Sequence, residues 1–265
     1  MLRFLALGVL MLVACNAQTV QGRHAQVELL AEPGAVATGR QLWLGIHFTM
    51  EKGWHIYWQN PGDSGQPPVL QWKLPAGFSV GELQWPHPEK LQNSTLMDYG
   101  YKDEVLLLAP IQAPPFVHDR PELMVDAKWL ICREVCIPEK AQLHLALPVK
   151  AAPADERNAQ LFAAARKLVP QPWPKKWKAN AVSQKDNFAV SFVMGKRLQR
   201  ADFFPLDPQQ IENAAPQVLR PTAQGATIML RKSDQLLKPV TVLHGVLVMS
   251  ATGESYRLEI PVTQQ

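Results

Sequence analysis

The sequence predicts an all-β protein made of sandwich domains, and three observations lead to this prediction. The 23 prolines and 15 glycines are scattered along the 265 residues rather than clustered. Aromatic and β-branched residues stand in short runs, which suit strands and turns better than long helices. A hydrophobic content of 47% is enough for the cores of one large domain or two ordinary ones.

The first 17 residues are typical of a secretory signal peptide. Arg3 supplies a positive charge, residues 4–13 are apolar, and small residues follow. The apolar stretch is too short for a permanent membrane span. Residues 12–15 (LVAC) also resemble a bacterial lipobox, in which Cys15 is acylated, whereas ordinary cleavage after Ala17 would place Cys15 at the −3 position. Both interpretations stay open, and both predict export.

Residues 24–150 are expected to form the first sandwich, because short apolar runs alternate with turn residues. Turn markers occur at 61–65, 75–77 and 86–88, at the spacing of a small sandwich. The strand signals are an alternation of Leu42, Leu44, Ile46 and Phe48, a nearly continuous apolar run from Val105 to Ile111, and an alternation of Leu143, Leu145 and Leu147.

A helix is expected over 155–169, with Asp155 as its N-cap and apolar residues at helical spacing. It must end at Pro170, and the proline- and lysine-rich segment 171–177 is expected to be a stiff, solvated connection. Helix and linker together occupy 151–178.

Residues 179–265 are expected to form a second sandwich, with a structural or partner-binding role. Strand-like runs are broken by turn residues and no cysteine is present. These runs cover 189–194, 226–230, 240–249 and 256–262.

Cys132 and Cys136 form a CxxxC pair that is the most informative feature of the chain. Export favours disulfide formation. Four extended residues span about 13 Å, whereas bonded cysteines need Cα atoms roughly 4.4–6.8 Å apart, so the segment has to turn. Closing so short a loop stabilises a fold by only about 2 kcal/mol, so the spacing suits exchange better than stapling.

The neighbours of the pair leave the thiolate chemistry undecided. Arg133 would stabilise a thiolate and Glu134 would oppose that effect. A structural disulfide is one alternative, and a Cu(I) site of a copper-tolerance module is another, with His144 or Met97 as a third ligand. The CxxxC spacing is also shared by Sco-type copper proteins, but those have βαβ units that this chain lacks. We expect no cofactor.

Other functions find less support. A net charge of +4 is too slight and dispersed for nucleic acid. The tryptophans are expected mostly to fill a core, although segment 53–65 also allows a non-catalytic sugar-binding surface. His55 reads as an ordinary hydrogen-bonded residue. Segment 97–103 is either a hairpin leading into a strand or a lid whose aromatic ring covers the sulfurs.

Three segments together resemble the periplasmic N-terminal region of the DsbD/ScsB thiol:disulfide interchange proteins. The ScsB branch is more similar, because of the CxxxC spacing and of a second β-domain that carries residues 202–205 (DFFP) and 213–217 (NAAPQ). The resemblance covers nearly all of the exported chain. The three segments are 53–65 (GWHIYWQNPGDSG), 99–105 (YGYKDEV) and 129–138 (WLICREVCIP).

The resemblance implies two immunoglobulin-like sandwiches in the periplasm, free or lipid-anchored. Cys132 and Cys136 would be the exchanging pair of a disulfide reductase or electron relay. Asp98, Tyr99 and Tyr101 would belong to the cap loop that shields the cysteines. A membrane-embedded donor of the DsbD/CcdA type would re-reduce the pair, which would pass electrons to periplasmic disulfide-containing proteins. The chain is expected to act as a stand-alone protein without the family's membrane and thioredoxin-like domains.

Overall fold

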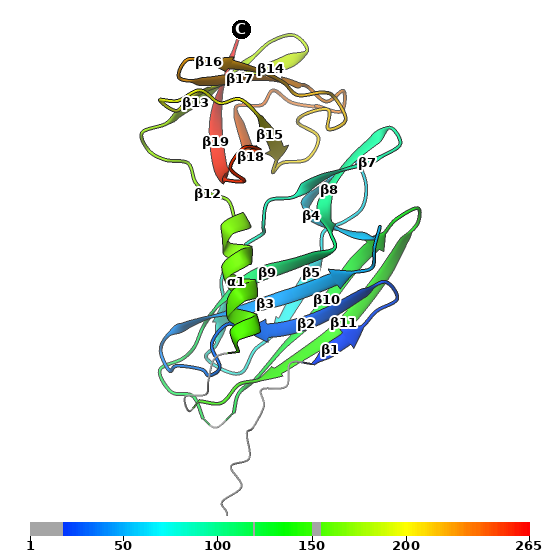
Figure 1. The fold of residues 1–265 in the computed structure, drawn as a ribbon, viewed down its shortest axis with the longest axis vertical. Helices are drawn as coiled ribbons and strands as arrows, with labels where there is room; N and C mark the ends of the chain where they lie inside the picture. The colour runs from blue at the N-terminus through cyan, green and yellow to red at the C-terminus, as the bar shows by residue number, and fades with distance from the viewer. Residues whose placement is uncertain (1–17, 119, 150–154) are drawn as a thin grey trace, which may run out of the picture.

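The computed structural model describes residues 18–118, 120–149 and 155–265. Over these residues the protein has the predicted all-β architecture, with two immunoglobulin-like sandwich domains and a helix between them in the chain (Figure 1). The predicted signal peptide, with Cys15, lies outside the described residues.

One layer of the first domain is an antiparallel sheet in the order β1-β2-β3-β9-β6. Each neighbouring pair is antiparallel, as expected for strands joined by turns. The strands are β1 (Thr19–Gln21), β2 (Ala25–Ala31), β3 (Gln41–Met50), β6 (Ser79–Val80) and β9 (Glu104–Gln112).

The facing layer carries the two cysteines and has the order β11-β10-β4-β8-β7, with β5 also paired to β10. Its longest pairing is the hairpin of β10 and β11. The strands are β4 (His55–Gly62), β5 (Val69–Lys73), β7 (Glu89–Asn93), β8 (Leu96–Lys102), β10 (Glu122–Cys132) and β11 (Cys136–Ala146).

The core of this domain lies between the two layers. Along β10 the inward positions alternate with more exposed ones, as period-two patterning requires. The tryptophan prediction holds for the three most buried rings, Trp54, Trp58 and Trp129, which are 6%, 0% and 4% exposed. Trp129 meets Phe48 of the facing layer edge to face, with ring centroids 5.4 Å apart.

Helix α1 (Glu156–Leu168) forms where the sequence predicts it, capped by Asp155. The Asp155 carboxylate accepts hydrogen bonds from the Arg157 and Asn158 backbone N–H groups. The helix is more than a connector, because Phe162 and Ala165 are buried against leucines of β2 and β9 on the outer side of the first domain. Within the described residues, no helix is long and apolar enough to cross a bilayer.

The second domain has its own core and a sheet path of β15-β18-β19-β13-β14-β17-β16, with β12 paired to β19. Most pairs are antiparallel, whereas β12 and β13 run parallel to β19. The strands are β12 (Gln171–Pro172), β13 (Lys178–Ser183), β14 (Asn187–Val193), β15 (Ala201–Pro205), β16 (Val218–Thr222), β17 (Gly225–Arg231), β18 (Val242–Met249) and β19 (Ser255–Gln264).

Segment 171–177 differs from the solvated connection that its prolines and lysines predict. Trp173 and Trp177 lie half-buried against Tyr256, with ring centroids 5.9 and 5.1 Å away. Lys175 and Lys176 are exposed as expected. The tryptophans therefore attach this segment to the second domain.

Candidate functional site

Cys132 and Cys136 end one strand and begin the next at the tip of the β10–β11 hairpin. They are paired directly across the ladder, with Cα atoms 4.2 Å apart, and form a disulfide. Residues 133–135 make the turn, in which the Arg133 N–H donates to the Val135 carbonyl. The turn that the spacing requires is thus a β-hairpin.

Strand β11 continues through Pro138, which lies opposite Leu130. A proline cannot donate a ladder hydrogen bond, so sheets accept it mainly on edge strands. Strand β11 stands at the end of the sheet order, where this condition is met. The strand beyond Cys136 is therefore regular, and the proline leaves the hairpin intact.

The two cysteines differ strongly in exposure. Cys132 is 1% exposed and pairs with His55 of β4 on its other side, whereas Cys136 is an exposed residue. A partner that approaches from solvent would therefore meet Cys136 first.

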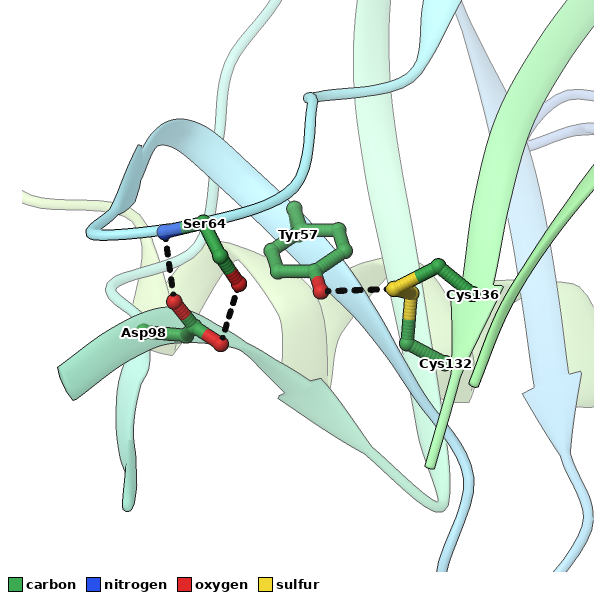
Figure 2. Close-up of a disulfide and its surroundings, with 5 residues drawn as sticks. All are labelled: Tyr57, Ser64, Asp98, Cys132 and Cys136. Atoms are coloured by element: carbon green, nitrogen blue, oxygen red, sulfur yellow. Dashed lines mark hydrogen bonds between the residues drawn. A yellow bond between two sulfur atoms is a disulfide. The ribbon is translucent and has the colours of Figure 1, made fainter. Parts of the chain in front are cut away.

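Tyr57 of β4 points its hydroxyl at the exposed cysteine (Figure 2). The Tyr57 hydroxyl oxygen lies 3.3 Å from the Cys136 Sγ. A disulfide sulfur carries no hydrogen, so the hydroxyl is the donor. Burial raises the pKa of Tyr57; a hydrogen bond with Ser64 opposes this and the Asp98 charge adds to it. The phenol is therefore protonated at neutral pH and available as a donor.

Residues 62–65, which we call the covering loop, lie over Tyr57. Gly65 has a φ of +77°, and a Cβ there would come within 2.1 Å of the Tyr57 ring. The Ser64 N–H and hydroxyl both donate to Asp98, at 2.8 and 2.9 Å (Figure 2). The loop and the Asp98 carboxylate together hold the tyrosine beside the disulfide.

The residues expected to shield the sulfurs take different positions in the structure. Asp98, Tyr99 and Tyr101 all lie in β8 and are buried. Asp98 belongs to the network beside the disulfide, but the Tyr99 hydroxyl donates to Asn213 and the Tyr101 hydroxyl to the Pro86 carbonyl.

The aromatic ring that meets a sulfur is Tyr57, which the sequence analysis did not single out. A signal was present, because Trp54 to Trp58 is an aromatic-rich run between Gly53 and Pro61 and suits a strand.

Arg133 and Glu134 stand at the exposed tip of the hairpin. The Arg133 guanidinium lies over the Trp54 ring, 5.3 Å from its centroid, and Trp54 stacks on His24 from the first domain's N-terminal segment. Such a cation–π contact fastens the tip to the sandwich by about 0.5–1 kcal/mol. The Arg133 guanidinium thus contacts an aromatic ring.

His55 is a further group beside the pair. Its ring is buried, its Nε2 has no hydrogen-bond partner among the described residues, and it meets Tyr57 edge to face. Burial lowers the pKa of His55; the Asp98 charge opposes this effect, and the Lys102 charge adds to it. A neutral imidazole therefore stands beside Cys132 in the ladder.

Of the third metal ligands considered from the sequence, His144 lies far from the sulfurs along the strand. His144 lies opposite Met124, eight positions along β11 from Cys136, which corresponds to about 26 Å of strand. Met97 is buried in β8. In the parts of the chain that the structure describes, no group of three or more His, Cys, Asp or Glu residues could hold a metal ion.

The fold and this geometry define a class: an immunoglobulin-like domain that presents a disulfide at the tip of a hairpin, with a tyrosine hydroxyl against one sulfur. Residues 26–148 match the family model of the N-terminal domain of the thiol:disulfide interchange protein DsbD. Over these residues the first domain is similar to a family of thiol:disulfide interchange modules. No curated protein sequence matches the chain.

The solved structures extend the comparison to both domains. The N-terminal periplasmic domain of ScsB from Proteus mirabilis matches with a TM-score of 0.72 and 19% identity, covering 94% of this chain and 98% of the other. The likeness shows a shared two-domain fold. The yeast GGA1 GAE domain also matches, with 14% identity over 50% of this chain and 99% of the other, but its TM-score of 0.29 supports no argument.

Proposed function

We propose that the protein is a periplasmic disulfide reductase or electron relay that works through Cys132 and Cys136. The observation that carries this proposal is a disulfide at a hairpin tip in which Cys132 is buried and Cys136 is exposed. The Cys136 sulfur also lies 3.3 Å from the Tyr57 hydroxyl. A purely structural disulfide would add little stability here, because closing so short a loop contributes only about 2 kcal/mol to the free energy of unfolding.

The exchange has two steps. In the dithiol form, the Cys136 thiolate attacks one sulfur of a partner's disulfide, and the other partner sulfur leaves as a thiolate. Cys132 then attacks the Cys136 sulfur and releases the partner's remaining sulfur. The partner gains two electrons and two protons, and Cys132 and Cys136 are oxidised to the disulfide.

Two neighbours assist these steps. The Tyr57 hydroxyl, 3.3 Å from the Cys136 sulfur in the oxidised form, would donate a hydrogen bond to the thiolate and lower its pKa. His55 is buried beside Cys132, and its lowered pKa keeps it neutral. It would accept the proton of Cys132 before the second step.

The electrons would come from a membrane-embedded donor of the DsbD/CcdA type and go to periplasmic disulfide-containing proteins. The family to which the first domain is similar supports this assignment. Export is part of the same proposal, and the intact mass of the protein from a membrane fraction distinguishes lipid attachment at Cys15 from cleavage after Ala17.

Single-cysteine variants test the exchange. Reduced Cys132→Ala should react with an aromatic disulfide such as 5,5′-dithiobis(2-nitrobenzoate) and keep the adduct. Reduced Cys136→Ala should react at least about tenfold more slowly because its sulfur is buried. The reduced wild type should release both thiolates of one reagent molecule and form the Cys132–Cys136 disulfide. The oxidised wild type, which has no free thiol at this pair, is the negative control. Equal rates in the two variants would exclude the proposed order.

The reduction potential tests the direction of use. A pair in equilibrium with glutathione, above about −300 mV, fits an exchanging couple. A lower value, together with no exchange against any protein dithiol, would mark a permanent bridge.

A further inference from the structure

The second domain contacts the first at the covering loop, which lies over Tyr57. The Asn213 side chain, between β15 and β16, donates from Nδ2 to Asp63 Oδ1 at 2.7 Å and accepts at Oδ1 from the Tyr99 hydroxyl at 3.0 Å. Asp63 belongs to the covering loop. Both polar atoms of this amide are thus engaged by the first domain.

The start of the covering loop is held by the same domain. Asn60 donates from Nδ2 to the Pro205 carbonyl at 2.8 Å, and its Oδ1 accepts the N–H of Gly62 at 3.2 Å. Phe204, next to Pro205, packs edge to face on Tyr99 and Trp58, with centroids 5.2 and 6.2 Å apart. The second domain therefore fastens both ends of the segment 60–63.

The covering loop leads in turn to the sulfur. Asp63 also accepts the Met97 backbone N–H at 2.7 Å, which seats the loop on β8. Ser64 follows and binds Asp98, and Gly65 rests on the ring of Tyr57. An unbroken series of contacts thus runs from Asn213 to the tyrosine at Cys136.

We propose that the second domain sets the reactivity of the redox pair, with Asn213 as the positioning residue that keeps the covering loop closed over Tyr57. This inference rests on the proposed function of Cys132 and Cys136. It assigns the second domain a role in controlling access to a site that it does not itself contain.

The test is the rate at which tris(2-carboxyethyl)phosphine reduces the oxidised full-length protein. The phosphine attacks a sulfur directly, so the rate reports access. Asn213→Ala should raise the second-order rate constant roughly tenfold, the factor expected when one hydrogen bond to a charged group no longer holds the loop closed.

Two control variants each remove a different interdomain contact and keep the Asn213–Asp63 hydrogen bond. Arg257→Gln removes the Arg257–Glu82 ion pair, an interdomain contact away from the covering loop, and should stay within about twofold of the wild type. Tyr99→Phe removes the other bond of Asn213 and leaves the Asp63 bond, so it should also have little effect.

Asn213→Asp is the second informative variant. It retains an acceptor for Tyr99 but opposes the Asp63 carboxylate with a like charge, so at pH 7.5 it should accelerate reduction as Asn213→Ala does. If Asn213→Ala fails to fold, this variant decides. In a double-mutant cycle, Asn213→Ala should add nothing to Asp63→Ala, because both remove the same bond.

A wild-type rate in the folded Asn213 variants would overturn the assignment, and so would equal acceleration in Arg257→Gln. These results are distinct from a failure of the proposed function. A pair that the phosphine reduces at Asn213-dependent rates, but that never exchanges with a protein dithiol, would refute the proposed function and leave the positioning role in place.

Discussion

At the scale of single residues, the difference between the two cysteines is created by their places in the ladder. Cys132 has neighbours on both sides, β11 and His55 of β4, and is buried. Cys136 begins an edge strand and has only Cys132 across from it. One position in the hairpin therefore suits a nucleophile, and the other suits a resolving group.

Tyr57→Phe should raise the pKa of the Cys136 thiol by about one to two units in the reduced Cys132→Ala background. A hydrogen bond to a charged group is worth about 1.5–3 kcal/mol, and one pKa unit corresponds to about 1.4 kcal/mol. The pH dependence of iodoacetamide alkylation measures the change. Tyr101→Phe is the matched control, because its hydroxyl is bonded to the Pro86 carbonyl instead. Equal thiol pKa values in the two variants would contradict the role of Tyr57.

The sequence predicts the cysteine pair at this scale but not its surroundings. Cys132 and Cys136 stand out by their spacing, which is local information. The contact of Tyr57 with Cys136 spans 79 positions, and that of Asn213 with Asp63 spans 150. Such contacts depend on strand register and domain packing, which no local pattern encodes.

At the scale of elements, the sequence predicts the strands whose apolar residues alternate or form a continuous run. Strands β3, β9 and β11 appear where alternating or continuous apolar runs indicate them. Strand β4 (His55–Gly62) is harder to predict, because its segment ends in Asn, Pro and Gly, which are typical of a turn. Its Tyr57 and Trp58 are both buried, one beside the disulfide and one in the core, which erases the alternation.

Helix α1 should contribute to the stability of the first domain through Phe162. Phe162→Ala removes a fully buried ring from the contact with Leu106 and Leu108 and should cost about 3–5 kcal/mol. Asp155→Ala should cost about 1 kcal/mol through the lost cap. Urea unfolding measures both changes.

The exposed Lys167 of the same helix supplies the control, since Lys167→Ala should shift stability by no more than about 0.5 kcal/mol. If Phe162→Ala behaved like Lys167→Ala, the helix would be a mere connector, as the sequence alone suggests.

At the scale of the whole molecule, the buried His55 and the half-buried His87 should make stability depend on pH. Burial is the largest cause of the lowered pKa values of His55 and His87. The folded state therefore disfavours their protonation, while the unfolded chain binds the proton near pH 6.5. The stabilisation is fully present above about pH 6.5 and is lost as the pH falls through the folded pKa values.

Thermal unfolding at pH 7.5 and 5.5 measures this dependence. The wild type should have the lower Tm at pH 5.5, and the difference should shrink when His55 and His87 are both replaced by Gln. Exposed His118 is the control, because His118→Gln should retain the full acid sensitivity. An unchanged difference in the double variant would assign the acid effect to other groups.

The sequence predicts two sandwiches and the helix between them, because each follows from its own segment. It does not predict how the sandwiches meet. Residues 202–205 and 213–217 appear in the sequence only as part of a resemblance. In the structure, Phe204 and Asn213 from these segments contact Tyr99 of the redox domain.

The long β10–β11 ladder has a consequence for the proposed electron relay. Eleven residues of each strand hold the hairpin together, so opening the sulfur–sulfur bond releases only the three-residue tip. Donor and acceptor proteins would then meet nearly the same surface in either oxidation state. They could not distinguish the dithiol form from the disulfide form by shape. The direction of electron transfer would therefore be decided by the relative reduction potentials of the proteins that bind.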